Sequence, residues 1–158
     1  KQFQQSNFVE TVTEIVRLHN INPGRLKIEL TESTILDNVD ATTEKMQQLK
    51  KLGIAFSMDD FGTGYSSLAS LKRFNFDYIK IDADFIRLLA DERQDVVLVS
   101  SILSLANSLG LEAIAEGVET EEQAQVLRGM GCSFAQGYLF SKPLYADEFK
   151  QFLSQQSI

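Results

Sequence analysis

The sequence is poor in the side chains that bind soft metals or link strands covalently. Its 158 residues include one cysteine, Cys132, one histidine, His19, and no tryptophan. A single cysteine cannot form a disulfide within the chain, which favours a reducing, cytoplasmic location. One cysteine and one histidine are also too few for a zinc site of the Cys/His type. Any metal in this protein is therefore expected to be held by oxygen ligands.

Neither of these two residues is a strong candidate for catalysis. Cys132 could act as a nucleophile only with His19 as its imidazole partner, and a small buried thiol is the simpler interpretation. His19 keeps helical step with Phe8, Val12 and Ile15, which predicts a place on one helix face. Both residues are therefore expected to be structural.

Long apolar runs and an excess of positive charge are absent as well. No run approaches the length of about 20 residues that a membrane span needs, and no signal-peptide pattern opens the chain. The 15 lysines and arginines against 22 aspartates and glutamates give a net charge of −7. Binding to a nucleic acid polymer is not expected, because no basic cluster is present to replace condensed counterions. A small anionic ligand remains compatible, since a bound metal reverses the local charge of an acidic site.

What the sequence does contain is a repeated alternation of strand and helix patterns. Its composition, 44% hydrophobic and 23% charged, is that of one globular unit. The order of strand and then helix predicts an α/β fold with a parallel sheet, either open or closed into a barrel. Strands are expected over 26–30, 54–58, 78–82, 113–115 and 133–135. Helices are expected around Phe8–Val16 and over 39–52, 66–73, 84–109 with an interruption near Asp91, 121–130 and 146–154.

The most informative segment runs from Asp59 to Leu68. Asp59 and Asp60 follow an apolar strand pattern and precede glycines at 62 and 64. Alternate residues of a strand face opposite sides, so the two carboxylates cannot share one site while the backbone stays extended. The glycines supply the freedom for an abrupt turn beyond the strand. Taken alone, the segment fits either a solvated turn or a seat for a divalent metal.

Polar side chains follow all five predicted strands at their carboxyl ends. Parallel α/β proteins bind ligands at this edge. Turn acids placed by chance would not also bring a lysine and a glutamine to the same edge, so a shared site is predicted. The residues concerned are Glu29, Asp59, Asp60, Lys80, Asp82, Glu116, Glu119 and Gln136.

Five segments of the sequence stand out in this context, at 28–33, 59–68, 78–82, 115–120 and 135–144. They resemble, in this order, motifs of the EAL-domain family, whose members are phosphodiesterases of the bacterial second messenger cyclic di-GMP. The resemblance implies a (β/α)8 TIM-type barrel, a fold of about 250 residues, of which this chain would hold five of the eight βα units. The Glu-Ala-Leu segment that names the family is not in the sequence, and neither is the asparagine of the family's third strand.

Residues 1–158 are accordingly expected to form an N-terminally incomplete EAL-type phosphodiesterase domain. The chain opens on Lys1 rather than methionine, which suggests a piece of a longer protein. That parent protein could carry sensory, GGDEF or membrane domains.

The resemblance also implies a metal site and a reaction. Two divalent ions, Mg²⁺ or Mn²⁺, would activate a water that opens cyclic di-GMP to linear pGpG. Lys80 would orient that water or meet the developing negative charge. The implied metal ligands are Glu29, Asp59, Asp60 and Glu116. The implied catalytic residues are Lys80, Glu116, Asp59 and Asp60.

Further roles follow from the same resemblance. Gln136, Glu119 and Asp82 would contact the substrate or the surroundings of the second metal. Asp82 is also expected near Lys80, because both lie on one face of their strand. Glu32 would stabilise the loop over 59–67 by accepting hydrogen bonds from it.

Several alternatives stay open. The domain could be a non-catalytic cyclic di-GMP receptor or a protein-interaction module, because some family members have lost their ligands. Glu29 and Glu116 could instead be the two carboxylates of a barrel glycosidase, which would work in the presence of chelator. The resemblance implies a homodimer that pairs through the apolar residues of 84–109, and the alternative is that these residues form barrel core. The 158 residues alone are expected to have little or no hydrolase activity.

Overall fold

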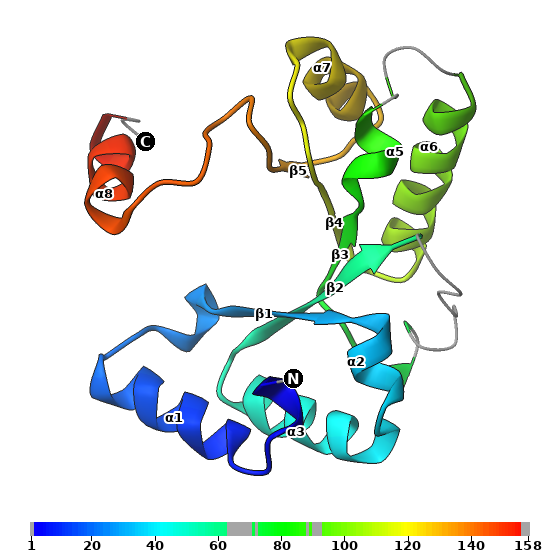
Figure 1. The fold of residues 1–158 in the computed structure, drawn as a ribbon. Helices are drawn as coiled ribbons and strands as arrows, with labels where there is room; N and C mark the ends of the chain where they lie inside the picture. Colours follow the sequence, from blue (N-terminus) through cyan, green and yellow to red (C-terminus); the bar gives the residue numbers. More distant parts are fainter. Residues whose placement is uncertain (1, 63–70, 72, 88, 90–92, 156–158) are drawn as a thin grey trace.

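One parallel sheet organises the protein, whose computed structural model describes residues 2–62, 71, 73–87, 89 and 93–155 (Figure 1). Its strands follow chain order, β1-β2-β3-β4-β5. A doubly wound sheet reverses its strand order, whereas consecutive strands of a barrel do not. The predicted α/β class is therefore confirmed, and the strand order is that of a barrel segment. The strands are β1 (Lys27–Thr31), β2 (Ala55–Phe61), β3 (Tyr78–Ile81), β4 (Glu112–Ala115) and β5 (Phe134–Ala135).

Helices connect the strands and follow the last one. The predicted helix over 84–109 is divided into α5 and α6 in the structure, and the interruption expected near Asp91 lies outside the described residues. Most of the helix predicted over 66–73 also lies outside them. No helix in the described part of the chain is long and apolar enough to cross a membrane. The helices are α1 (Phe8–Leu18), α2 (Glu32–Leu36), α3 (Val39–Lys51), α5 (Ala83–Arg87), α6 (Arg93–Ser108), α7 (Glu121–Gly129) and α8 (Ala146–Gln155), with short 3-10 turns at Gln2–Gln4 and Pro23–Arg25.

Local sequence explains where several helices begin. The Asn38 side chain accepts a hydrogen bond from the Ala41 backbone N–H and so caps α3. At the start of α7, Thr120 and Gln123 form a reciprocal capping box. These side chains satisfy backbone donors that the first helical turn leaves without partners. Both helices were predicted within two residues of these starts.

Strand β2 is longer than the sequence predicted. The strand was expected over 54–58, with both aspartates beyond it, but β2 continues to Phe61. The reason is continued pairing with β3: Met58 lies opposite Ile79, and Phe61 lies opposite Ile81. Two residues therefore stand between these pairs on β2 against one on β3, which is a β-bulge. The acidic pair occupies this bulge.

The two faces of the sheet differ in character. Apolar residues that alternate along the strands, such as Phe56, Met58 and Ile79, are fully buried in the core. On the opposite face, the Lys27 ammonium lies 3.3 Å from the ring centroid of Tyr78. The rings of Tyr78 and Phe134 meet edge to face, with centroids 6.2 Å apart. Side chains from β1, β3 and β5 thus form one layer, as alternate strands do inside a TIM barrel.

The last helix, α8, lies apart from the sheet and from the other helices (Figure 1). None of its residues is buried, and its apolar side chains Phe149 and Leu153 are each 50% exposed. The connection from β5 to α8 runs over residues 136–145. This segment and α8 border the cavity described below.

Candidate active site

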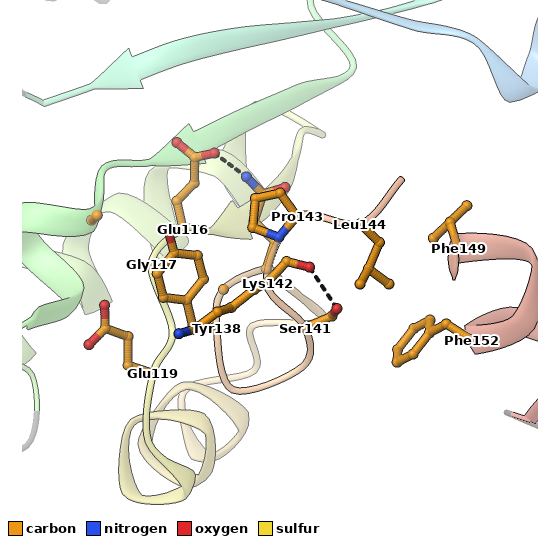
Figure 2. A pocket seen from close by; sticks show the side chains of 13 residues that line it. Glu116, Gly117, Glu119, Tyr138, Ser141, Lys142, Pro143, Leu144, Phe149 and Phe152 are labelled. Atoms are coloured by element: carbon orange, nitrogen blue, oxygen red, sulfur yellow. Dashed lines mark hydrogen bonds between the residues drawn. The ribbon is translucent and has the colours of Figure 1, made fainter. Parts of the chain in front are cut away.

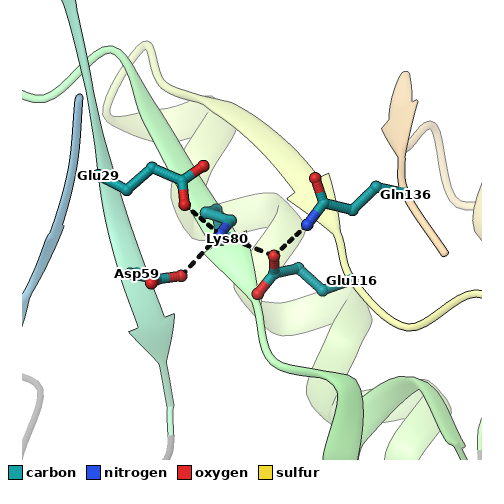
Figure 3. Close-up of polar contacts among 5 residues, drawn as sticks. All are labelled: Glu29, Asp59, Lys80, Glu116 and Gln136. Atoms are coloured by element: carbon teal, nitrogen blue, oxygen red, sulfur yellow. Dashed lines mark hydrogen bonds and ion pairs between the residues drawn. The ribbon is translucent and has the colours of Figure 1, made fainter. Parts of the chain in front are cut away.

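Lys80 lies at the centre of a group of carboxylates at the carboxyl edge of the sheet (Figure 3). Its Nζ atom is 2.6 Å from Glu29 Oε2, 2.8 Å from Asp59 Oδ1 and 2.8 Å from Glu116 Oε1. Glu29 comes from β1, Asp59 from β2, and Glu116 directly follows β4. The Lys80 side chain is only 6% exposed. Parallel pairing of the strands therefore brings together four residues that are far apart in the sequence.

The charges of this group shift each other's protonation. Burial alone would lower the pKa of Lys80, but hydrogen bonds to Asp59, Glu116 and Glu29 raise this pKa above its ordinary value. Burial raises the pKa of Glu116, and the nearby Lys80 ammonium opposes this rise only in part. Burial, followed by repulsion from Asp59 and Asp82, raises the pKa of Asp60. Lys80 is therefore held firmly in its charged form.

Adjacent residues Asp59 and Asp60 both reach the site because the chain leaves the extended conformation between them. Asp60 has a φ of 54°, in the left-handed region, where aspartate is one of the few tolerated side chains. Carboxylate oxygens of Asp59, Asp60 and Glu116 consequently lie within 4.8 Å of one another. The expected turn thus begins at Asp60, before Gly62, whose φ of 101° continues it. Gly64 lies outside the described residues.

The donor set of this site fits a hard divalent cation. Clustered carboxylate oxygens are the ligands that Mg²⁺, Mn²⁺ and Ca²⁺ prefer. Asp59, Asp60 and Glu116 form such a cluster. Glu29, the fourth predicted ligand, contacts Lys80, and its side chain is 45% exposed. The structure thus brings three predicted ligands into one group and places the fourth beside the same ammonium.

The other predicted site residues lie around this centre. The Gln136 side-chain amide donates a short hydrogen bond to Glu116 Oε1 (Figure 3). Asp82 accepts a hydrogen bond of 2.8 Å from the Asp84 backbone N–H at the start of α5. No bond between Asp82 and Lys80 is found among the described contacts, although Asp82 is close enough to raise the pKa of Asp60. Asp82 therefore lies at the rim of the site.

Glu32 is the first residue of α2. Most of the loop that it was expected to stabilise lies outside the described residues, so this role stays a prediction. The residue before it, Thr31, caps this helix: its hydroxyl accepts a hydrogen bond from the Thr34 backbone N–H.

A cavity of about 660 Å³ adjoins the carboxylate group (Figure 2). Glu116, Glu119 and Gln136 supply polar groups to its wall, and Tyr138 and Phe152 are among its aromatic residues. Tyr138 lies beside Glu116 and Glu119, and Phe149 and Phe152 of α8 lie on the opposite side (Figure 2). The motif over 135–144 indicated part of this wall, but no sequence pattern indicated that α8 would contribute to it.

Sequence reasoning missed Gln123, a buried polar residue that is hydrogen-bonded to the backbone of Glu119, one of the cavity-lining residues. Its Oε1 accepts hydrogen bonds from the backbone N–H groups of Glu119, at 2.8 Å, and Thr120, at 3.1 Å. Its Nε2 donates to the carbonyl oxygens of Ile86 and Arg87, at 3.1 and 3.3 Å. Gln123 thereby joins the segment after β4 to the end of α5. The capping-box spacing Thr120-x-x-Gln123 was the signal that could have identified it.

Comparison with known proteins gives consistent matches over nearly the whole chain. The model of the EAL domain family matches residues 1–143. The chain is 42% identical over 147 residues to MucR of Pseudomonas aeruginosa, a bifunctional diguanylate cyclase/cyclic di-GMP phosphodiesterase, covering 93% of this chain and 22% of MucR. The structure of the MucR phosphodiesterase in complex with cyclic di-GMP matches with a TM-score of 0.86 at 41% identity, covering 94% of this chain and 60% of that one.

Two other solved structures give the same picture. The EAL domain of Mycobacterium smegmatis DcpA matches with a TM-score of 0.93 at 36% identity, covering 99% of this chain and 70% of that domain. A complex of Klebsiella pneumoniae BlrP1 with manganese and cyclic di-GMP matches with a TM-score of 0.82 at 32% identity, covering 90% of this chain and 36% of BlrP1. The chain thus spans 22% of MucR and between 36% and 70% of these solved chains.

Proposed function

Because this chain belongs to the EAL domain family, we propose that it forms part of a metal-dependent phosphodiesterase site that hydrolyses cyclic di-GMP to linear pGpG. The observation that carries the proposal is the group of carboxylates from three strand ends around Lys80. The relatives MucR and BlrP1, which have been solved with cyclic di-GMP, support the choice of substrate.

Asp59, Asp60 and Glu116 would hold the metal, with Glu29 approaching from β1. Two divalent ions at such a site neutralise the phosphodiester and lower the pKa of a water molecule to near neutrality. The manganese complex of BlrP1 supports a divalent ion of this kind. The use of Mg²⁺ or Mn²⁺ by this protein is part of the proposal.

Two of the proposed metal ligands are also partners of Lys80. Lys80 and Gln136 both donate to Oε1 of Glu116, and Lys80 pairs with Oδ1 of Asp59. The carboxylates of Glu116 and Asp59 would therefore hold the metal while they contact the ammonium. The Lys80 ammonium would then lie close enough to orient the water or to stabilise negative charge that develops on the phosphate.

The cavity beside Glu116 would receive one end of the dinucleotide. Its aromatic residues, Tyr138 and Phe152, would stack on a purine ring, and Lys142 would attract a phosphate. Glu119 and Gln136 would supply hydrogen-bonding groups on the cavity wall. The flat bases of such a substrate suit the aromatic lining, and N–H donors on a base suit the carboxylate of Glu119.

The test is hydrolysis of cyclic di-GMP by the full-length protein that contains this chain. Linear pGpG should form with Mg²⁺ or Mn²⁺, and excess chelator should abolish its formation. Asp59→Asn should reduce the rate by about 100-fold or more, because it removes the negative charge of a proposed metal ligand. Asp77→Asn is the matched control, since Asp77 pairs with Lys50 outside the site. Binding of cyclic di-GMP without hydrolysis would favour the receptor alternative.

The same assay separates the remaining interpretations. Hydrolysis that continues in chelator would contradict the metal site. Residues 1–158 alone are expected to release little pGpG, because the domain matched in MucR is larger than this chain. A rate equal to that of the full-length protein would contradict this expectation.

We also propose that the protein acts in the cytoplasm as a homodimer that pairs near α6. Val97 and Leu98 support this surface, because they are 65% and 42% exposed, whereas Val99 and Ile102 of the same helix are buried in the core. One side of α6 therefore packs in the core, and a smaller apolar side stays exposed. Sedimentation that finds only monomer at high concentration would contradict the dimer.

A further inference from the structure

We infer that Lys80 is the internal counter-ion of the metal site, which holds the ligands together before metal binds and then competes with the metal for them. This inference rests on the proposed function, because it requires a divalent cation at Asp59, Asp60 and Glu116. It gives Lys80 a positioning role that precedes any contact with substrate.

The geometry of Lys80 is that of a fully occupied donor. A lysine ammonium has three N–H groups. Each can be matched to one carboxylate here, Glu29 at 2.6 Å and Asp59 and Glu116 at 2.8 Å. These partners come from three different strands, and the lysine comes from a fourth. One charge therefore connects four strand ends at the edge where the metal is proposed to bind.

The ammonium also offsets repulsion that the carboxylates would otherwise exert on one another. Like charges that are close together and partly buried destabilise each other more than they would in water. The side chains of Asp59 and Glu116 are 24% and 16% exposed, so water screens them incompletely. Removing the Lys80 charge should therefore destabilise the metal-free protein.

The same contacts make Lys80 a competitor of the metal. Asp59 and Glu116 belong both to the ammonium's partners and to the group whose oxygens lie within 4.8 Å of one another. A cation brought to that group is repelled by the ammonium and must share its ligands. Loss of the lysine charge is thus expected to have opposite effects on the two states: a weaker metal-free fold and tighter metal binding.

The test compares the full-length protein with its Lys80→Met variant, which keeps a similar chain length and removes the charge. Mn²⁺ alone is the probe, its affinity is measured by calorimetry, and thermal unfolding is followed with and without Mn²⁺. The variant should unfold at a lower temperature without metal and show a larger upward shift with Mn²⁺. Its dissociation constant for Mn²⁺ should fall by about tenfold, because one unit charge leaves a partly buried site.

Lys50→Met is the matched control. Lys50 pairs with Asp77 at 2.9 Å, away from the carboxylate group. This variant should lower the unfolding temperature by the same amount with and without Mn²⁺ and leave the Mn²⁺ affinity unchanged. Any general effect of losing a lysine ion pair is thereby separated from competition with the metal.

Each other outcome has a definite meaning. A Lys80→Met protein that unfolds without metal and regains a cooperative transition with Mn²⁺ supports the inference. A Lys80→Met protein that stays unfolded both with and without Mn²⁺ overturns the inference. So does a Lys80→Met protein that binds Mn²⁺ no more tightly than a wild type that binds it. Neither of these two outcomes contradicts the proposed function. A wild type that binds neither Mn²⁺ nor Mg²⁺ overturns both the inference and the proposed function.

Discussion

Gly137 passes so close to Val118 that a Cβ atom at position 137 would overlap the Val118 backbone. Hydrogen bonds run on both sides of this approach, from Val118 N–H to the Gln136 carbonyl at 3.1 Å and from Leu139 N–H to the Val118 carbonyl at 3.0 Å. The contact fixes the segment that carries Gln136 against the segment that follows Glu116. The alignment of these two side chains therefore depends on the absence of a side chain at 137.

We expect Gly137→Ala to destabilise the protein by about 1–3 kcal/mol. The atoms that a Cβ atom would overlap belong to the Val118 backbone, so they cannot move without shifting the whole segment. Urea unfolding measures this change. Gly129→Ala is the control, since a Cβ atom there would meet nothing within 4 Å and alanine favours the helix. Equal stability of Gly137→Ala and wild type would show that the two segments can separate without cost.

Asp60→Asn should preserve the fold while weakening metal binding. Asparagine tolerates the left-handed conformation of residue 60 but removes one negative charge from the carboxylate group. The affinity for Mn²⁺ should fall by about 10–100-fold, as measured by calorimetry on the full-length protein. Asp40→Asn, which affects an exposed pair with Arg73, should leave this affinity unchanged.

Gln123→Ala should cost about 2–3 kcal/mol of unfolding free energy, because it leaves buried backbone groups at two places without their hydrogen-bond partner. Equilibrium denaturation is the measurement. Gln125→Ala on the exposed side of the same helix should change stability by less than about 0.5 kcal/mol. Similar values for both variants would contradict a joining role for Gln123.

Cys132 should react slowly with thiol reagents near pH 8. Burial raises the pKa of its thiol above the ordinary value of 9.0, although hydrogen bonds to the backbone oppose this rise. The folded state therefore binds the thiol proton more tightly than the unfolded state, so this group's contribution to stability is complete below pH 9.0 and falls as the pH rises above it. Alkylation rates with and without guanidinium test the prediction. Equal rates would contradict it.

The sequence predicted the parallel sheet well because alternating hydrophobicity and strand-end polarity are local patterns. The same patterns identified Glu29, Asp59, Lys80 and Glu116 as neighbours, since parallel strands end at one edge. The bulge at Asp60 could not be predicted in this way. It depends on how β2 pairs with β3, which no residue of β2 determines by itself.

Two further features also depend on contacts between distant segments. The sequence indicates that Gln123 helps to cap α7. Its second role, a hydrogen bond to the end of α5, depends on where α5 lies in the fold. Phe152 lies on a helix that the sequence predicted, but no sequence pattern indicated that α8 would stand apart from the sheet and border the cavity. Local periodicity indicates which side of a helix is apolar, but it does not indicate what that side contacts.

The sequential order of the sheet has a consequence for the route by which the protein folds. Among the described residues, each strand from β1 to β4 pairs with the strand that follows it in the chain, so each pairing closes a loop of modest length. A chain that pairs its strands in this order brings Glu29 and Asp59 together first. Lys80 joins them with β3, and Glu116 arrives last with β4. The positive charge of Lys80 thus joins Glu29 and Asp59 before the third carboxylate, that of Glu116, is added.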